Sequence, residues 1–402
     1  MYEGPPLECR MRIAFYAPLK SPTHDVPSGD RRVARLLMQA LQMAGHDVEL
    51  VSDFRSFEGM GDPERQTGLR DAGQKIARDL IECWQGIGAQ KRPDLWFTYH
   101  LYYKAPDWLG PMVCQAMGLP YVVAEASHAP KRAGGPWAIG HEAALAAIRM
   151  ADLLLCPTRD DVAALEKVSH AGSVVLRLAP FLDPAPYGNA AQQRDLHRAQ
   201  LAAAHALDTL QPWMIVVAMM RSGDKLASYG LLAQALRTLA DLPWQMLVAG
   251  DGPARAQVRE MLEQAAPGRA RLMGQLDADA MAAAYAASDL CIWPAVNEAY
   301  GMSMLEAQAA GVPVVACAVR GVPDVVCDGL TGLLAPAGDT RQLAALARSL
   351  IVDAPRRRAM GQAARRFVQD ERSLGQAVRQ LNDAFDRLRS AAGPGSRSAD
   401  TT

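Results

Sequence analysis

The sequence contains no long apolar segment. Its longest clean apolar run is WMIVVAMM at 213–220, whereas a helix that crosses a bilayer needs about 20 residues. The opening MYEGPPLECR holds two acids and two prolines and has no apolar core, so it is not typical of a signal peptide. We therefore expect a soluble, cytoplasmic protein, and peripheral contact with an inner membrane stays open.

The sequence also lacks the cysteine pattern of a disulfide framework or metal site, and the strong positive charge of a protein that binds polyanions. The seven cysteines form no C-x-x-C pair, and several lie in apolar runs such as LLLC and DLCIW, where cysteine behaves as a small buried hydrophobe. An odd count without metal-ligand spacing is typical of a reducing cytoplasm. The formal net charge of −1 argues against a protein built to coat nucleic acid.

What the sequence does contain is two series of strand–helix units. The first starts with MRIAFYAP at 11–18 and continues through an amphipathic helical pattern to HDVELVS; the second starts at Trp213 with WMIVVAMM. Apolar strands separated by helical patterns imply parallel sheets covered on both faces. We predict an α/β protein with two doubly wound, Rossmann-like domains facing a central cleft, with ligands at the carboxyl ends of the strands.

Composition shifts suggest where these domains begin and end. Residues 183–210 are rich in proline, glycine and polar side chains, and the end of the chain, AAGPGSRSADTT, is small and polar; both are typical of connections or tails. We predict a first domain at 11–182, a linker at 183–210, a second domain at 211–372, a helix at 373–390 that returns to the first domain, and a disordered tail at 391–402.

Two acids in NEAYGMSMLEAQAAGVPVVA (297–316) are the strongest candidates for chemistry. Glu298 follows the predicted strand DLCIWP, and Glu306 lies inside a helix predicted to begin near Gly301. Eight positions on one helix would place them roughly 80° apart, so we interpret Glu298 as a loop residue and Glu306 as a helix residue that reach different parts of one ligand. From residue types alone, a dipole-stabilising Glu298 and a solvated Glu306 explain the pattern equally well.

The start of this helix would offer free backbone donors. The N–H groups of Gly301, Met302 and Ser303 lie in the predicted first turn, where unsatisfied donors and a partial positive charge favour an anion. A glycine there lets a ligand approach the backbone closely.

The surrounding blocks resemble a known family. PAVNEAYGMSMLEAQAAGVPVVA is similar to the Glu–seven residues–Glu motif of retaining GT-B glycosyltransferases (family 4-like, group 1). The segment RGVPDVVCDGLTGLLAPAGD (320–339) and the upstream LVAGDGPARAQV and RLMGQLDADAMAAAYAASDL match its neighbouring blocks. Together the blocks span about 245–340. We identify the chain as similar to this family because the order of blocks is specific.

The resemblance implies an enzyme: a retaining, metal-independent hexosyltransferase. It would move a hexose from a nucleotide-diphosphate sugar to a hydroxyl of a glycan, a lipid-linked or a small-molecule acceptor, with no metal and no other cofactor. In the family the first glutamate, here Glu298, contacts the donor sugar, and the second, here Glu306, contacts the ribose. The backbone at Gly301, Met302 and Ser303 would meet the sugar or diphosphate.

The resemblance also implies cations for the leaving diphosphate. Arg221 and Lys225 lie in MMRSGDKLASYG, after the first strand of the second half. The family's arginine usually lies nearer the strand end, where Met219 stands here. A solvated basic turn is the alternative for this pair.

Two candidates come from the first half. His128 ends the strand in VVAEASHAP, where the family often has a histidine near the donor sugar, and Gly29 in SGD opens the first helix, where the family often has a glycine pair. Ser28 replaces one of those glycines. A purely structural histidine is the alternative for His128.

Two other functions stay open: another GT-B chemistry, such as a nucleotide-sugar 2-epimerase, and a non-catalytic sugar-nucleotide-binding protein. The sequence names neither the donor sugar and base nor the acceptor. A basic patch on the acceptor side or toward a membrane could also form, from Arg31, Arg32, Lys131 and Arg132.

Overall fold

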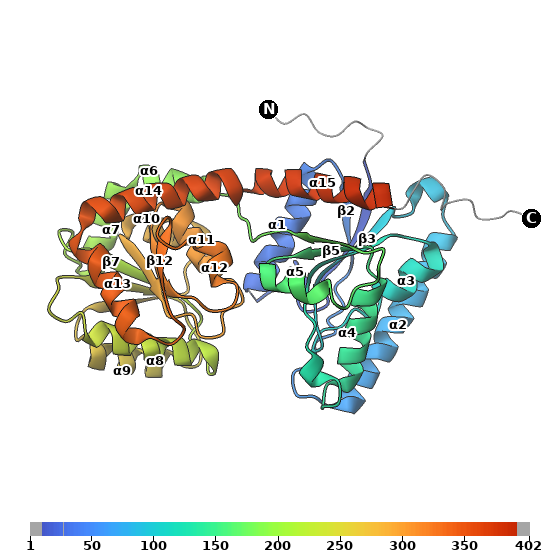
Figure 1. Cartoon of the computed structure of the whole chain (residues 1–402), viewed down its shortest axis with the longest axis horizontal. Coiled ribbons are helices and arrows are strands. Elements are labelled where there is room, and N and C mark those ends of the chain that lie inside the picture. Colours follow the sequence, from blue (N-terminus) through green and yellow to red (C-terminus); the bar gives the residue numbers. More distant parts are fainter. Residues whose placement is uncertain (1–9, 27, 392–402) are drawn as a thin grey trace, which may run out of the picture. The chain divides into compact units, whose positions relative to one another are not determined.

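The computed structural model describes residues 10–26 and 28–391. The chain divides into two compact units, each with its own sheet: unit 1 is 1–179 with 375–402, and unit 2 is 180–374 (Figure 1). The tail predicted at 391–402 lies outside the described residues, apart from Ala391. In the part of the chain that the structure describes, no helix combines the length and apolar character that a membrane span requires.

Unit 1 is built on a six-stranded sheet in the order β2-β1-β3-β4-β5-β6. Each strand pairs in parallel with its neighbours. The strands are β1 (Arg12–Tyr16), β2 (Asp47–Ser52), β3 (Leu95–Leu101), β4 (Tyr121–Ala126), β5 (Leu153–Cys156) and β6 (Val174–Arg177).

Helices cover this sheet because its strands are apolar on both faces. Figure 1 shows the helices that lie against the sheet. Trp84, Val113 and Ile148, from three different helices, share one buried cluster with Trp96 of β3. The α-helices of unit 1 are α1 (Gly29–Met43), α2 (Pro63–Gln85), α3 (Gly110–Met117), α4 (Ala138–Met150), α5 (Arg159–Leu165) and α15 (Leu374–Ala391); η2 (Ala89–Lys91) and η3 (Pro130–Arg132) are short 3₁₀ turns.

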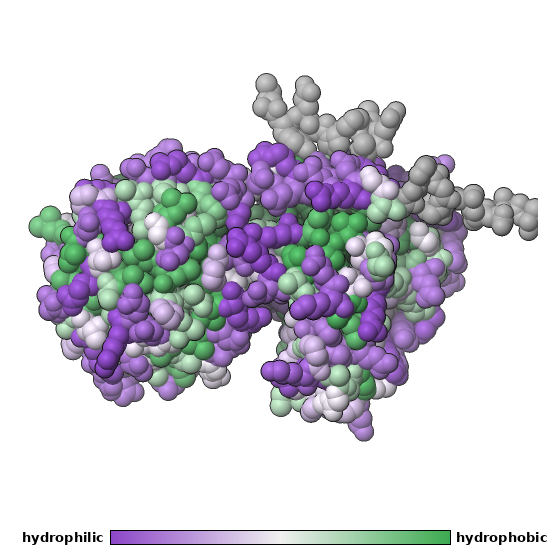
Figure 2. All heavy atoms as spheres, in the orientation of Figure 1, coloured by the Kyte–Doolittle hydropathy of each residue, from purple (hydrophilic) through white to green (hydrophobic). Residues whose placement is uncertain are grey.

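The last helix, α15, folds with unit 1 although it follows unit 2 in the chain. One stripe of it is buried, formed by Leu374, Val378, Leu381, Phe385 and Leu388, and the ring of Phe385 lies 5.3 Å from the ring of His46. The outer surface of α15 is hydrophilic (Figure 2). This one-sided pattern is what a helix needs to pack on a core from outside.

Unit 2 repeats the design with a second parallel sheet in the order β12-β11-β10-β7-β8-β9. Its strands are β7 (Trp213–Val217), β8 (Gln245–Ala249), β9 (Ala270–Gly274), β10 (Leu290–Trp293), β11 (Val314–Cys317) and β12 (Gly332–Ala335). Its helices are α6 (Ala185–Gln192), α7 (Arg194–His205), α8 (Asp224–Arg237), α9 (Arg255–Ala265), α10 (Ala278–Ala287), α11 (Met302–Ala309), α12 (Val322–Val325), α13 (Thr340–Val352) and α14 (Ala354–Glu371).

The predicted linker at 183–210 requires correction. This segment forms α6 and α7, which pack on α10 inside unit 2, and the units divide at 179/180. The reason is a pair of arginines one helical turn apart: Arg194 and Arg198 bind the Asp289 carboxylate at 2.8 and 3.0 Å. The guanidinium of Arg198 also lies 4.1 Å from the ring centroid of Trp213.

The strand orders confirm two doubly wound parallel sheets. In unit 1 the order reverses between β1 and β3, and in unit 2 between β7 and β10. Ligands of such sheets bind outside the carboxyl ends of the strands at this reversal. The loops that follow β1, β3, β7 and β10 lie at these two positions.

Candidate functional site

In unit 2 the strand reversal brings together the loops that follow β7 and β10. Glu298 from the second loop accepts hydrogen bonds from the Lys225 ammonium and from Trp293 Nε1, the latter at 3.2 Å. The Lys225 ammonium also lies 5.6 Å from the centroid of the Trp293 ring. The Glu298 and Lys225 side chains are only 17% and 21% exposed, so this is a half-buried ion pair and Glu298 is not a solvated surface charge.

The loop that carries Glu298 has an unusual backbone. Ala295 and Asn297 have positive φ values of 61° and 50°, a region that costs non-glycine residues roughly 1–3 kcal/mol each. Asn297 compensates with its side chain: it donates to Asp224 Oδ2 at 2.8 Å and accepts from the Arg320 guanidinium at 3.3 Å. Helix α8 and the loop after β11 thereby hold the Glu298 loop from both sides.

Gly301 ends this loop as the N-cap of α11. Its φ is 80°, and a Cβ at this position would overlap the Met304 methyl group, so glycine is strongly favoured there. Met302 and Ser303 form the first turn of the helix, whose leading N–H groups lie outside the helical hydrogen-bond ladder. The backbone donors predicted from the sequence therefore lie next to the ion pair in the chain.

Glu306 lies in the second turn of α11 and is buried, with 6% of its surface exposed. The Tyr285 hydroxyl lies 3.2 Å from Glu306 Oε2 and 2.9 Å from the Ser303 carbonyl oxygen. The interpretation of Glu306 as a solvated charge is wrong. Sequence reasoning missed Tyr285, which looks like an ordinary core residue of α10; burial raises its pKa well above the usual value.

The two cations of the loop after β7 differ in their surroundings. Lys225 contacts Glu298, whereas Arg221 is exposed. Met219, at the place of the family's arginine, is also exposed, with 47% of its surface accessible. Of the two predicted cations, Lys225 therefore contacts the Glu298 loop, whereas Arg221 lies at the surface.

In unit 1, Gly29 and His128 lie in segments that follow strands. Gly29 is the first residue of α1, after Ser28, whose hydroxyl accepts the Arg31 N–H at 3.2 Å. A Cβ at Gly29 would meet no atom within 4 Å. His128 is half-buried, its ring lies 5.5 Å from that of His141, and burial lowers its pKa.

A further charged group lies at the strand reversal of unit 1, and sequence reasoning missed it. His100 Nδ1 lies 3.1 Å from Asp30 Oδ1 and 3.6 Å from Glu125 Oε1. His100 and Glu125 both have positive φ values, 61° and 59°. Burial of His100 opposes its charge, but Glu125 and Asp30 together raise its pKa. A histidine at the end of a strand was the available signal.

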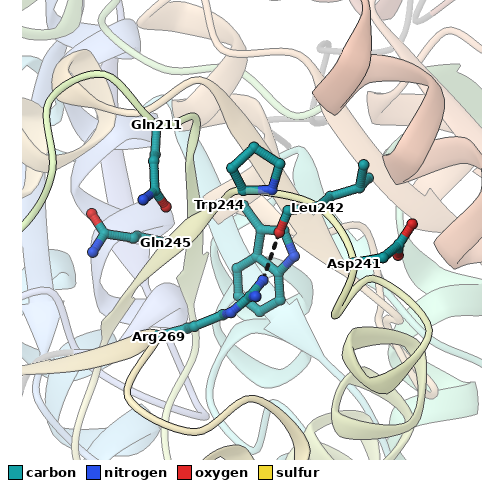
Figure 3. Close-up of a pocket in the computed structure, with 7 residues that line it drawn as sticks. Gln211, Asp241, Leu242, Trp244, Gln245 and Arg269 are labelled. Atoms are coloured by element: carbon teal, nitrogen blue, oxygen red, sulfur yellow. Dashed lines mark hydrogen bonds between the residues drawn. The ribbon is translucent and has the colours of Figure 1, made fainter.

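A pocket of about 450 Å³ lies at the opposite edge of the unit 2 sheet, where its strands begin (Figure 3). Its polar groups already bond to the protein: Arg269 donates to the Leu242 carbonyl at 2.7 Å, and Trp244 Nε1 donates to Leu239 at 2.7 Å. It contains none of the predicted site residues, and its lining is Gln211, Asp241, Leu242, Pro243, Trp244, Gln245 and Arg269. We assign it no role in the chemistry.

The charged side chains of the site are not arranged as a metal centre. Within residues 10–26 and 28–391, no group of three or more histidine, cysteine, aspartate or glutamate side chains is placed to hold a metal ion.

Comparison with known proteins finds similarity to glycosyltransferases, strongest in unit 2. Residues 214–367 match the family model "Glycosyl transferases group 1". A D-inositol 3-phosphate glycosyltransferase of Corynebacterium aurimucosum is 45% identical over 84 residues, which are 21% of this chain and 20% of that protein. Another of the same name, from Geodermatophilus obscurus, is 28% identical over 330 residues, 77% of this chain and 69% of that protein. The match to the first of these relatives thus spans only about a fifth of its length.

Solved structures show the fold over nearly the whole chain. Sucrose-phosphate synthase from Thermosynechococcus elongatus has a TM-score of 0.71 and 22% identity, covering 95% of this chain and all of that one. Anabaena HepE, solved in complex with UDP-glucose, has a TM-score of 0.68 and 15% identity, covering 94% and 100%. The chain therefore has the GT-B fold, and residues 214–367 of its second unit match the glycosyl transferases group 1 family.

Proposed function

We propose that the chain is a retaining glycosyltransferase that moves a hexose from a nucleotide-diphosphate sugar to an acceptor hydroxyl. The observation that carries the proposal is the half-buried Glu298–Lys225 pair, which adjoins the first turn of α11 inside the family segment 214–367. A structural neighbour, Anabaena HepE, binds UDP-glucose, which supports a nucleotide sugar as the donor.

Glu298 and Lys225 suit the two halves of the reacting bond. A carboxylate accepts two hydrogen bonds from a sugar diol, and charged acceptors bind more strongly than neutral ones. Lys225 has three N–H donors, so it can contact Glu298 and a phosphate oxygen together. Charge that grows on the leaving diphosphate is stabilised by such a cation, with Arg221 as a second one and the N–H groups of Met302 and Ser303 beside them.

Glu306 suits the ribose. Its carboxylate is buried and held by the Tyr285 hydroxyl at 3.2 Å, so it is positioned before a ligand arrives. A buried acceptor that is left without a hydrogen-bond donor carries a desolvation cost. Ligands with a ribose diol are therefore favoured, because their hydroxyls donate to this carboxylate. In this proposal Glu306 binds the nucleotide and Glu298 the sugar, and the two acids do not act as an acid–base pair.

The chemical step needs no metal or cofactor in this proposal. The leaving phosphate oxygen takes the proton of the acceptor hydroxyl, which attacks from the face that the phosphate leaves. Gly29 and His128 stay predictions from the resemblance, for contacts of unit 1 with the diphosphate and the sugar.

A thermal-shift panel of UDP-, GDP- and ADP-sugars tests the donor assignment. A ligand present at 100 times its Kd stabilises the native state by about 2.7 kcal/mol, so the correct donor raises the Tm and the others do not. No shift with any of them would remove the basis of the proposal. With a donor and acceptor in hand, NMR of the anomeric proton shows whether the configuration is retained.

The same experiments distinguish the two open alternatives. Conversion of the sugar nucleotide without any acceptor would indicate an epimerase. Tight binding without turnover over a broad acceptor panel would indicate a binding protein.

A further inference from the structure

Two cations of unit 1 converge on the same pair of aromatic rings. The Lys104 ammonium lies 4.6 Å from the centroid of the Trp137 ring and 6.0 Å from that of Tyr103. The Arg132 guanidinium lies 5.1 Å and 5.4 Å from the same two centroids. The rings themselves are 5.7 Å apart and nearly perpendicular. We call these four residues the basic–aromatic cluster.

The cluster is built on a fixed backbone. Tyr103 and Lys104 follow β3, Arg132 ends η3, and Trp137 immediately precedes α4, so all four lie in loops at the carboxyl edge of the sheet. The loop after β2 ties them together: Trp137 Nε1 donates to the Glu58 carbonyl at 3.2 Å, and the Glu58 N–H donates to the Lys104 carbonyl at 2.8 Å. The rings therefore have a defined position for the cations to pack on.

The two positive charges have no acidic partner within ion-pair distance among the residues that the structure describes. The neighbouring Glu58 carboxylate is buried and accepts the backbone N–H groups of Met60 at 2.7 Å and Gly61 at 2.5 Å. Lys104 has one long hydrogen bond, 3.5 Å, to the Gly59 carbonyl. Two cations that pack on the same rings without an acidic partner repel each other, and an anion bound by both would offset this repulsion.

We propose that Lys104 and Arg132 bind a phosphate-bearing group. An arginine supplies a planar pair of donors that matches phosphate, and a lysine adds a compact charge. Cation–π packing on the two rings orients both cations before the ligand arrives. Met60, 80% exposed beside this loop, would contact an apolar part of the same ligand.

Under the proposed function this phosphate group belongs to the acceptor, whereas phosphate binding by the cluster does not itself depend on that function. The sequence suggested a basic patch that included Arg31 and Arg132. In the structure, the cation that shares the rings with Arg132 is Lys104. Arg31 is instead bonded to the Asp25 carbonyl at 3.1 Å.

Titration calorimetry of the full chain at constant ionic strength tests the cluster, with inorganic phosphate and glycerol 3-phosphate as probes. We expect binding by the wild type and at least about tenfold weaker binding by Lys104→Gln/Arg132→Gln, since about 1.4 kcal/mol is lost with the charged hydrogen bonds. The matched control is Lys91→Gln/Lys167→Gln, which removes two exposed charges elsewhere in unit 1 and should bind as the wild type does. The charge-conserving Lys104→Arg/Arg132→Lys should retain most of the binding and guards against a folding defect.

Flotation with vesicles distinguishes a soluble phosphate ester from a lipid headgroup. Binding to phosphatidylglycerol vesicles, but not to phosphatidylcholine vesicles or soluble phosphate, that is lost in the Gln/Gln variant supports the proposal with a lipid as the source. Equal binding by the Gln/Gln variant and the wild type in both assays, or no binding in either, overturns it. Because the donor panel is a separate measurement, phosphate binding without any donor shift would contradict the glycosyltransferase proposal and leave this one standing.

Discussion

The Tyr285 hydroxyl of α10 lies 3.2 Å from the Glu306 carboxylate of α11. Both residues are buried, so the hydrogen bond holds an acid in place in the second turn of α11. We expect Tyr285→Phe to weaken nucleotide binding about tenfold. A hydrogen bond to a charged group contributes about 1.5–3 kcal/mol, and only part of that energy enters the binding free energy. Calorimetry with the stabilising nucleotide measures this, and the nucleotide affinity of Glu306→Ala should fall further.

A matched control for this experiment is Tyr121→Phe. Tyr121 is equally buried and donates to the Asp107 carboxylate of unit 1 at 2.9 Å. This variant should lower stability without changing nucleotide affinity. If Tyr285→Phe and Glu306→Ala both leave the affinity unchanged, Glu306 does not bind the nucleotide.

The Lys225–Glu298 pair predicts a loss of turnover. Lys225→Gln should lower kcat about 10²–10³-fold, the range for removal of a preorganised group that stabilises developing charge. Arg221→Gln should have a smaller effect because Arg221 is exposed. Steady-state kinetics of both variants, with folding checked by thermal unfolding, measures the difference; equal losses would argue against a special role for the ion pair.

The same pair predicts non-additive stability effects. Residues in direct contact show coupling energies of about 0.5–3 kcal/mol, so the free energy of unfolding of Lys225→Gln/Glu298→Gln should differ from the sum of the single variants. Urea unfolding of the four proteins completes this cycle. Strict additivity would mean that the two side chains do not interact in solution.

Gly301 and Gly29 predict opposite outcomes on substitution by alanine. Gly301→Ala places a Cβ at φ 80° against Met304 and should destabilise the protein by about 1–3 kcal/mol. Gly29→Ala meets no atom within 4 Å and should leave stability nearly unchanged. If Gly29→Ala nevertheless weakens donor binding, the ligand approaches the backbone there; unchanged binding would remove Gly29 from the site.

His100 predicts a pH dependence with a definite sign. Its pKa is raised in the folded protein, because Glu125 and Asp30 outweigh the opposing effect of burial. Its contribution to stability is therefore complete below about pH 6.5, its unfolded pKa, and is lost as the pH rises through the folded pKa. His46, whose pKa burial lowers to about 4, has the opposite effect: its contribution to stability is present above about pH 6.5 and is lost as the pH falls toward 4.

The measurement compares urea unfolding of the wild type and His100→Gln from pH 5 to 9. The stability difference between them should shrink as the pH rises above about 6.5. A difference that stays constant over this range would mean that His100 does not change its charge there.

The sequence predicted most of the fold because its strands are short, apolar and regularly separated by helical patterns. It also placed Glu298 in a loop and Glu306 in a helix, since Gly301 interrupts the pattern between them. The structure has this division, with α11 beginning at Met302. These features depend on residues that are close in the chain.

What the sequence did not reveal depends on residues that are far apart in the chain. The segment 183–210 looks like a linker until Asp289 is placed beside Arg194 and Arg198. The same holds for His100 with Asp30. No local pattern marks such partners, because only the packing of strands and helices in the folded chain brings them together.

Helix α15 has a consequence for synthesis of the protein. Unit 1 takes its Val378 and Phe385 from this helix, and both are buried, yet all of unit 2 is translated before them. The nascent first unit therefore waits with the surface around His46 uncovered until translation reaches the helix. A released chain truncated after residue 374 should be bound by chaperones and cleaved by proteases in unit 1, while unit 2, which is complete, resists cleavage.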